Sequence, residues 1–188
     1  MPDQLGKPFA QPLFKRVALI GLGLIGSSLA RGIRRMNLAG AIHAIDLDLH
    51  VCERVTALKI ADLVTQDAVA GVKGCDLIIL CVPVGACKAL AQQIGQYLEP
   101  DAILSDVGSV KTSVVQAVEP HIPDTVHFIP AHPVAGTEYS GPDAGFSTLF
   151  HNRWCILTPL ENVNQSKAGL LQNFWEGLGA NVEIMTPQ

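Results

Sequence analysis

The chain has 188 residues, of which 48% are hydrophobic and 16% are charged, and its formal net charge is −4. These values predict one domain of ordinary size with a large core. They argue against disorder and against a nucleic-acid partner, which would need a basic surface. The longest apolar stretch, residues 17–30, is too short and too rich in glycine to predict a membrane span, and the first residues do not form a secretory signal.

Short apolar runs alternate with helix-like segments after a loose N-terminal arm, residues 1–14, which precedes a single domain at residues 15–188. Strands are predicted at residues 17–20, 41–45, 63–65, 76–82, 102–105, 126–131, 154–158 and 181–185. Helices are predicted at residues 26–36, 50–58, 84–97, 110–122 and 164–178. This alternation predicts an α/β fold with a doubly wound, largely parallel sheet that helices cover on both faces, and the last predicted strand completes it.

A glycine-rich turn follows the first predicted strand and opens into a helix. Gly21, Gly23 and Gly26 form a G-x-G-x-x-G pattern that encloses Leu24 and Ile25. Such a turn lets the backbone approach a pyrophosphate, while the helix N-terminus supplies N–H donors and a positive dipole. A turn that only packs a helix on a strand is the alternative, but the flanking strand and helix favour a dinucleotide site.

An acidic residue stands where such a site needs one. Asp46 lies twenty residues after Gly26, at the end of the next predicted strand, where a carboxylate can accept hydrogen bonds from the adenosine ribose hydroxyls. A carboxylate repels a 2′-phosphate, so the sequence predicts NAD rather than NADP. Asp48 replaces Asp46 in this role if the strand ends two residues later. Val82 and Pro83, at the end of the strand predicted at 76–82, should border the cofactor, although a plain strand-to-helix turn fits them equally well.

Two further segments follow predicted strands and carry polar groups. In the first, Ser109 is expected to cap the following helix, and its hydroxyl could also orient a catalytic group. Lys111 is interpreted as a solvated charge at the start of that helix, with contact to an anion as the alternative.

In the second segment, Pro133 keeps His132 out of the helical conformation. The ordinary pKa of a histidine suits removal of a hydroxyl proton while hydride leaves the same carbon, so His132 is a candidate general base. The alternative is a histidine held by backbone hydrogen bonds in a loop.

The cysteines do not predict a reactive or metal-binding site. They number five and include no C-x-x-C pair, and the six histidines lack metal-ligand spacing. We interpret the cysteines as reduced thiols in a cytoplasmic protein.

Four segments together resemble the prephenate/arogenate (cyclohexadienyl) dehydrogenase family of tyrosine biosynthesis. They are Gly-Leu-Gly-Leu-Ile-Gly-Ser-Ser at 21–28, Asp-Val-Gly-Ser-Val-Lys at 106–111, His-Pro-Val-Ala-Gly-Thr-Glu-Tyr-Ser-Gly at 132–141 and Trp-Cys-Ile-Leu-Thr-Pro at 154–159. The resemblance implies a Rossmann-like domain that uses NAD in the oxidative decarboxylation of prephenate or arogenate. It implies that His132 is the base, that Ser109 orients it, and that Thr137 and Glu138 lie near the substrate.

One departure from the family bears on activity. Family members continue into an all-helical domain that forms the dimer and supplies a second histidine segment and an arginine for the substrate carboxylate, whereas this chain stops at Gln188. No arginine in the chain is a convincing substitute. We therefore expect a nucleotide-binding domain that is largely monomeric and inactive by itself, with a homodimeric full-length parent. The alternatives are a β-hydroxyacid or imine reductase with the same cofactor fold, and a non-catalytic dinucleotide-binding module.

Overall fold

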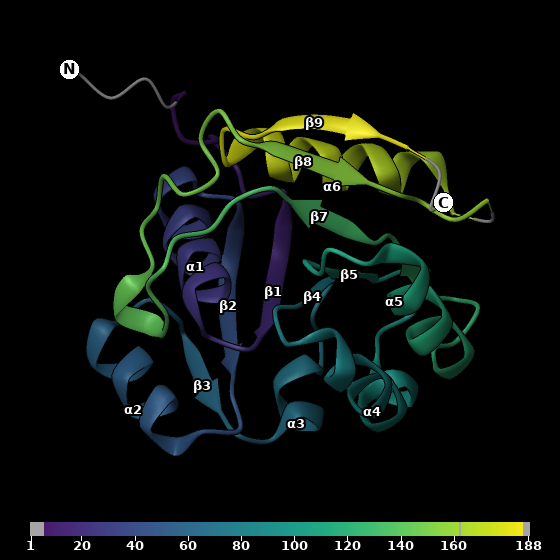
Figure 1. Ribbon diagram of the computed structural model, residues 1–188, viewed down its shortest axis with the longest axis horizontal. Helices are drawn as coiled ribbons and strands as arrows, with labels where there is room; N and C mark the ends of the chain where they lie inside the picture. Colours follow the sequence, from purple (N-terminus) through teal and green to yellow (C-terminus); the bar gives the residue numbers. More distant parts are fainter. Residues whose placement is uncertain (1–5, 162, 186–188) are drawn as a thin grey trace.

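The computed structural model describes residues 6–161 and 163–185. Its main sheet has six parallel strands in the order β3-β2-β1-β4-β5-β6 (Figure 1). In chain order these strands are β1 (Phe14–Ile20), β2 (Ala39–Ile45), β3 (Leu63–Thr65), β4 (Leu77–Leu80), β5 (Ile103–Asp106) and β6 (His127–Phe128). This is the doubly wound arrangement expected from the sequence, and its strand order reverses between β1 and β4, where such sheets bind ligands.

Helices cover both faces of this sheet. One face packs against α1 (Leu24–Met36), α2 (Leu49–Leu58) and α6 (Gln165–Gly177), and the other against α3 (Ala68–Val72), α4 (Val84–Ile94) and α5 (Lys111–Val118). Three short 3₁₀ helices complete the helical segments: η1 (Gly95–Tyr97), η2 (Glu119–His121) and η3 (Pro142–Ala144). The helix α3 was not predicted; its five residues include a glycine and follow Asp67, whose side chain accepts hydrogen bonds from Val69 and Ala70.

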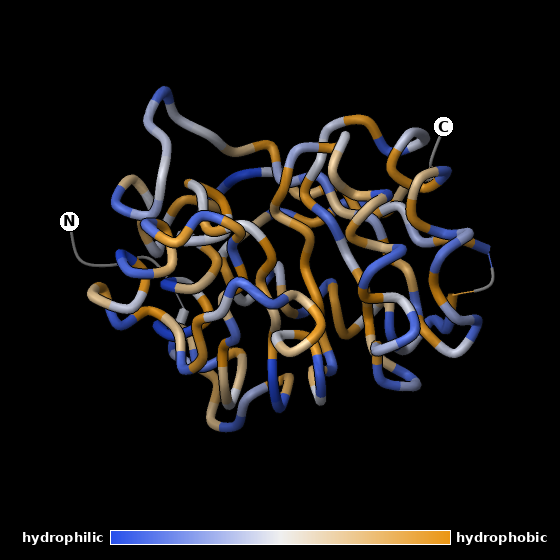
Figure 2. Tube along the Cα trace, turned by 90° about the horizontal axis from the view of Figure 1, so that it is seen from below, coloured by the Kyte–Doolittle hydropathy of each residue, from blue (hydrophilic) through white to orange (hydrophobic). Residues whose placement is uncertain are grey.

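The alternation of side chains along the strands explains their continuous apolarity. In β1, Val17 and Leu19 point into the core beneath α1 and α6, whereas Ala18 and Ile20 point into the core beneath α4 and α5. Both sets are buried, so neither face of a central strand can be polar. Figure 2 shows hydrophobic stretches running through the middle of the molecule, with hydrophilic residues concentrated in the outer turns.

A second sheet of three strands corrects the predicted topology. It consists of β7 (Ala131–Pro133), β8 (Trp154–Leu157) and β9 (Asn181–Ile184), with β7 antiparallel and β9 parallel to β8 (Figure 1). The sequence predicted a single strand at 126–131 and placed 181–185 in the main sheet. The chain instead leaves the main sheet after Ile129, whose N–H donates to Leu104. The next N–H on that side, from Ala131, meets the side-chain carboxylate of Asp106 instead of the backbone of β5.

Two segments run outside the strands and fasten to α1. Near the N-terminus, Phe9 packs on the core and its N–H donates to Met36 at 3.0 Å. Residues 134–153, which connect β7 to β8, pass over α1, where the N–H of Phe146 donates to Ser28 Oγ at 3.1 Å. We call residues 134–153 the strap. None of the helices within residues 6–161 and 163–185 combines the length and apolarity needed to span a membrane.

Candidate active site

The glycine turn between β1 and α1 leaves an open approach to the helix N-terminus. Gly21 has a φ of +96°, and a Cβ there would lie 2.6 Å from the carbonyl oxygen of Cys81. A Cβ on Gly26 would lie 2.0 Å from the carbonyl oxygen of Gly21, whereas one on Gly23 would have no described atom within 4 Å. Two glycines are therefore required by packing, and the third faces free space.

That space suits an anionic group. Gly23 is the N-cap of α1 and has no side chain with which to cap it, and the first turn, which the structure describes in full, holds no acidic residue. The first N–H groups of α1, including those of the half-buried Leu24 and Ile25, therefore remain available to a phosphate, which the helix dipole also attracts. The turn fits the pyrophosphate of a dinucleotide.

Asp46 is fastened beside this turn. Its Oδ2 accepts a hydrogen bond from the N–H of Leu22 at 2.7 Å, and its Oδ1 accepts one from the N–H of Asp48 at 3.0 Å. The carboxylate of Asp48 instead caps α2, because its Oδ1 accepts a hydrogen bond from the N–H of His50 at 2.8 Å. The geometry therefore favours Asp46 over Asp48 as the acid that meets a ribose.

Val82 and Pro83 lie at the neighbouring strand end. The Cγ1 of Val82 lies 3.0 Å from the point where a Cβ on Gly21 would stand, and Pro83 is exposed as the N-cap of α4. Both residues therefore flank the glycine turn.

The carboxyl end of β5 stands beside these groups. The N–H of Cys81 donates to Ile20 and the N–H of Val107 donates to Leu80, so the segments after β1, β4 and β5 form one edge. His132 reaches this edge from β7. It lines an open cavity of about 390 Å³ together with Ser109, Pro133, Val134, Ala135, Gly136 and Arg153.

The surroundings of His132 favour its neutral form. Burial, followed by the nearby Lys111 cation, lowers the pKa of the imidazole, and the Asp106 carboxylate opposes this to a smaller extent. A neutral imidazole can accept a proton, so a histidine in this environment remains a competent base at pH values where an exposed histidine is largely protonated.

Lys111 is not the solvated charge that we predicted. Its side chain is 10% exposed and its Nζ lies 2.6 Å from Asp106 Oδ2, 2.8 Å from Asp106 Oδ1 and 2.6 Å from the carbonyl oxygen of Ala131. The start of α5 would face water in an isolated helix, but β7 lies against it here. The alternative, contact with an anion, is what the structure shows, and the anion is the Asp106 carboxylate, which is 1% exposed.

Ser109 lies in the His132 cavity but does not cap α5. The N-cap is Val110, whose side chain makes no capping hydrogen bond. Ser109 is exposed, so its hydroxyl is free to turn toward the cavity. Thr137 and Glu138 are exposed on the strap just beyond the lining residues, and Thr137 Oγ1 accepts from the N–H of Tyr139 at 3.2 Å.

Arg153 was not predicted as a site residue, yet it is the one positively charged residue among the described residues that line this cavity. It lies 21 residues after His132, and only the pairing of β7 with β8 brings it near, through the N–H of Val134, which donates to Trp154 at 2.8 Å. No local pattern in the sequence announces such a contact.

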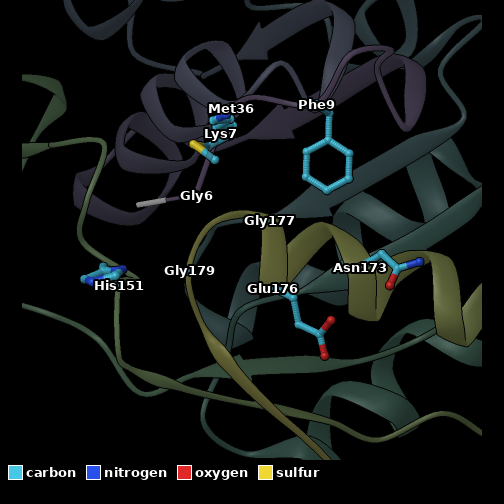
Figure 3. A pocket seen from close by; sticks show the side chains of 9 residues that line it. All are labelled: Gly6, Lys7, Phe9, Met36, His151, Asn173, Glu176, Gly177 and Gly179. Atoms are coloured by element: carbon cyan, nitrogen blue, oxygen red, sulfur yellow. The ribbon is translucent and has the colours of Figure 1, made fainter. Parts of the chain in front are cut away.

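A second cavity, of about 450 Å³, is separate from these groups (Figure 3). It lies between the N-terminal segment and the C-terminal ends of α1 and α6, with Met36, Glu176 and Gly177 among its lining residues. Because α1 has 13 residues, Met36 stands roughly 18 Å from the helix start that faces the glycine turn. None of the predicted site residues lines it.

Comparison with known proteins identifies the family. Residues 29–184 match the sequence profile described as "Prephenate dehydrogenase, nucleotide-binding domain". The chain is 38% identical over 176 residues to the cyclohexadienyl dehydrogenase of Zymomonas mobilis. The matched residues cover 94% of this chain and 60% of that protein. The prephenate dehydrogenase of Aquifex aeolicus in complex with hydroxyphenyl propionate and NAD+ superposes with a TM-score of 0.84 at 30% identity, covering 92% of this chain and 60% of that one. The Synechocystis arogenate dehydrogenase gives the same four values.

These matches favour the prephenate dehydrogenase family over a β-hydroxyacid or imine reductase. The 3-hydroxyisobutyrate dehydrogenase of Mycobacterium tuberculosis and a pyrroline-5-carboxylate reductase of Coxiella burnetii match this chain at only 14% and 17% identity, which shows a shared fold alone. The chain spans about 60% of the length of the relatives named above. It therefore belongs to the prephenate dehydrogenase family and corresponds to the nucleotide-binding domain of that family.

Proposed function

We propose that this chain binds NAD+ and, within a longer protein, supplies the base for the oxidative decarboxylation of prephenate or arogenate. The observation that carries the proposal is that His132 stands at the sheet edge that also holds the open glycine turn. Asp46, hydrogen-bonded to that turn, supports NAD+ over NADP+, because a carboxylate repels a 2′-phosphate. The relative from Aquifex aeolicus, whose structure contains NAD+, supports the same cofactor.

When bound, NAD+ would supply the hydride acceptor. His132 would take the proton of the ring hydroxyl, so that the oxygen can form a carbonyl as the hydride leaves the same carbon. The ring carboxylate then leaves as carbon dioxide, the ring becomes aromatic, and the proton returns to the ring oxygen. Because aromatisation drives the reaction, the protein mainly has to position the substrate and to hold one base.

The remaining groups of the cavity would orient the substrate. Ser109 would hold the His132 ring through its hydroxyl, and Arg153 would attract a carboxylate of the acidic substrate. Thr137 and Glu138, on the strap next to the lining residues, would lie at the substrate mouth. We also propose that the full-length parent is a homodimer and that it lies in the cytoplasm, a reducing compartment that suits five unpaired cysteines.

The test separates binding from turnover. Calorimetry on the 188-residue chain should show NAD+ binding that is tighter than NADP+ binding. An absorbance assay for NADH should show turnover of prephenate or arogenate by the longer protein and none by the chain alone. If the longer protein binds NAD+ but forms no NADH with either substrate, the chain is part of a non-catalytic nucleotide-binding protein and the proposal is wrong.

A further inference from the structure

The backbone beside His132 lacks the support that a strand usually has. Among the described strands, β7 pairs with β8 and not with β5, although β7 passes the carboxyl end of β5. The ladder between β5 and β6 ends where the N–H of Ile129 donates to Leu104 at 2.9 Å, and the next N–H on that side, from Ala131, meets the side-chain carboxylate of Asp106 rather than the backbone of β5. Another contact must therefore hold this side of β7 against the main sheet.

Lys111 adds to the contact of Ala131 with Asp106 from the start of α5. Its ammonium group has three N–H donors, and three acceptors lie within hydrogen-bond distance: the two carboxylate oxygens of Asp106 and the carbonyl oxygen of Ala131. The side chains of Lys111 and Asp106 are 10% and 1% exposed, so water competes little for these bonds. One side chain thus connects the end of β5, the start of α5 and the first residue of β7.

We propose that Lys111 and Asp106 are positioning residues for His132: their buried ion pair fixes the Ala131–His132 peptide and sets the electric field around the imidazole. The proposal rests on the proposed function, in which His132 is the base. The carbonyl that Lys111 holds belongs to the same peptide bond as the His132 nitrogen. Fixing it fixes the backbone from which the ring extends toward the cavity.

Four charged or titratable side chains surround His132, and two of them, Lys111 and Asp106, act on its charge. Lys111 faces it from α5, Asp106 from β5, Cys155 from β8, and Arg153 lines the same cavity. Burial raises the pKa of the Cys155 thiol, so that side chain is uncharged. Lys111 disfavours the imidazolium and Asp106 favours it to a smaller extent. Removal of either partner should therefore move the titration of His132, and the two removals should move it in opposite directions.

An NMR titration of the 188-residue chain tests this without substrate. The ring proton signal of His132 is assigned by its loss in His132→Asn. In Lys111→Met, His132 should titrate at higher pH than in the parent, because a cation has gone. In Asp106→Asn, it should titrate at lower pH, because Lys111 is left without its anion. General loosening of the fold would instead expose the ring and raise its titration in both variants.

Two further variants keep the test decisive. Lys88→Met removes an exposed lysine on α4 and should leave the His132 titration unchanged. Each single change in the pair leaves one buried charge without a partner, so the double variant Asp106→Asn/Lys111→Met replaces the measurement if a single variant does not fold. In the double variant, the pKa of His132 should lie above that of the parent but below that of Lys111→Met. The double variant loses both the Lys111 cation, which lowers this pKa, and the Asp106 anion, which raises it to a smaller extent. An unchanged titration in the variants, or a shift in the same direction for both single variants, overturns the proposal.

Turnover by the longer protein is a second, independent measurement of the positioning role. In the longer protein, Lys111→Met should lower kcat by about 10²-fold, the cost of a base displaced by about 1 Å, and leave the Kd for NAD+ unchanged. If the titration behaves as expected but the longer protein forms no NADH from either substrate, the proposed reaction fails and the positioning of His132 by Lys111 and Asp106 stands. If NADH forms but the titration does not respond, the positioning proposal alone fails.

Discussion

Replacement by alanine should affect two glycines of the same turn differently, lowering stability at Gly26 and NAD+ affinity at Gly23. A Cβ on Gly26 would lie 2.0 Å from the carbonyl oxygen of Gly21, about 1.4 Å short of ordinary contact, so α1 and the turn must separate. Overpacking of this kind costs about 1–3 kcal/mol, which is roughly 2–12 °C in Tm for a chain of this size. Gly23 has a φ of −70°, which alanine adopts without strain, and a Cβ there meets no described atom within 4 Å. We therefore expect Gly23→Ala to unfold within about 2 °C of the parent.

NAD+ affinity should also distinguish Gly23→Ala from the parent. The space in front of Gly23 is where the pyrophosphate would approach, so a methyl group there should weaken NAD+ binding by at least about tenfold, or about 1.4 kcal/mol. Thermal unfolding and calorimetry with NAD+ measure both effects. Gly169→Ala is the control, because it adds a methyl group to open space on α6 and should not change NAD+ affinity. If Gly23→Ala binds NAD+ like the parent, the turn does not hold the pyrophosphate. If Gly26→Ala is as stable as the parent, the packing argument is wrong.

Other predictions concern the two halves of the site. In the longer protein, His132→Asn should lower kcat by about 10²–10⁴-fold with little change in NAD+ affinity, and Ser109→Ala should cost less; near-normal turnover in His132→Asn would remove that residue from the mechanism. Asp46→Ser should reduce the preference for NAD+ over NADP+ in calorimetry, and an unchanged ratio would show that another group sets it. Arg153→Met should raise the KM for prephenate or arogenate more than it lowers kcat, whereas an unchanged KM would exclude a carboxylate contact. Because burial and Lys111 lower the pKa of His132, the fall of kcat/KM toward acid pH should be centred below the ordinary pKa of a histidine; a fall centred at or above that ordinary pKa would contradict this environment.

The main sheet and the glycine turn could be predicted because their signals are local. A strand buried on both faces must be apolar throughout, and the turn, its flanking elements and Asp46 lie within 30 residues of one another. His132 could be singled out because Pro133 and its position after a strand restrict its backbone.

The features that were missed depend on contacts between distant segments. Lys111 is buried only because β7 turns away at Pro130 and covers the start of α5, and no residue near Lys111 in the sequence encodes that turn. Arg153 joins the His132 cavity only through the pairing of β7 with β8 across the strap. The missed α3 is a different case, because five residues are too few to show helical periodicity.

The position of β8 between β7 and β9 sets an order in which the two halves of the site can form during synthesis. The glycine turn, Asp46 and Val82 are all present once β4 and its following turn have left the ribosome. His132, by contrast, lies on a three-residue strand whose ladder partner, β8, begins 21 residues beyond the end of β7, and β9, the other partner of β8, begins at residue 181. Contacts that span so much sequence form late, because the intervening chain must be ordered first. The residues of the nucleotide-binding half therefore leave the ribosome before the strand that pairs with β7, but their core is complete only when α6, which packs on the same face of the sheet, has followed.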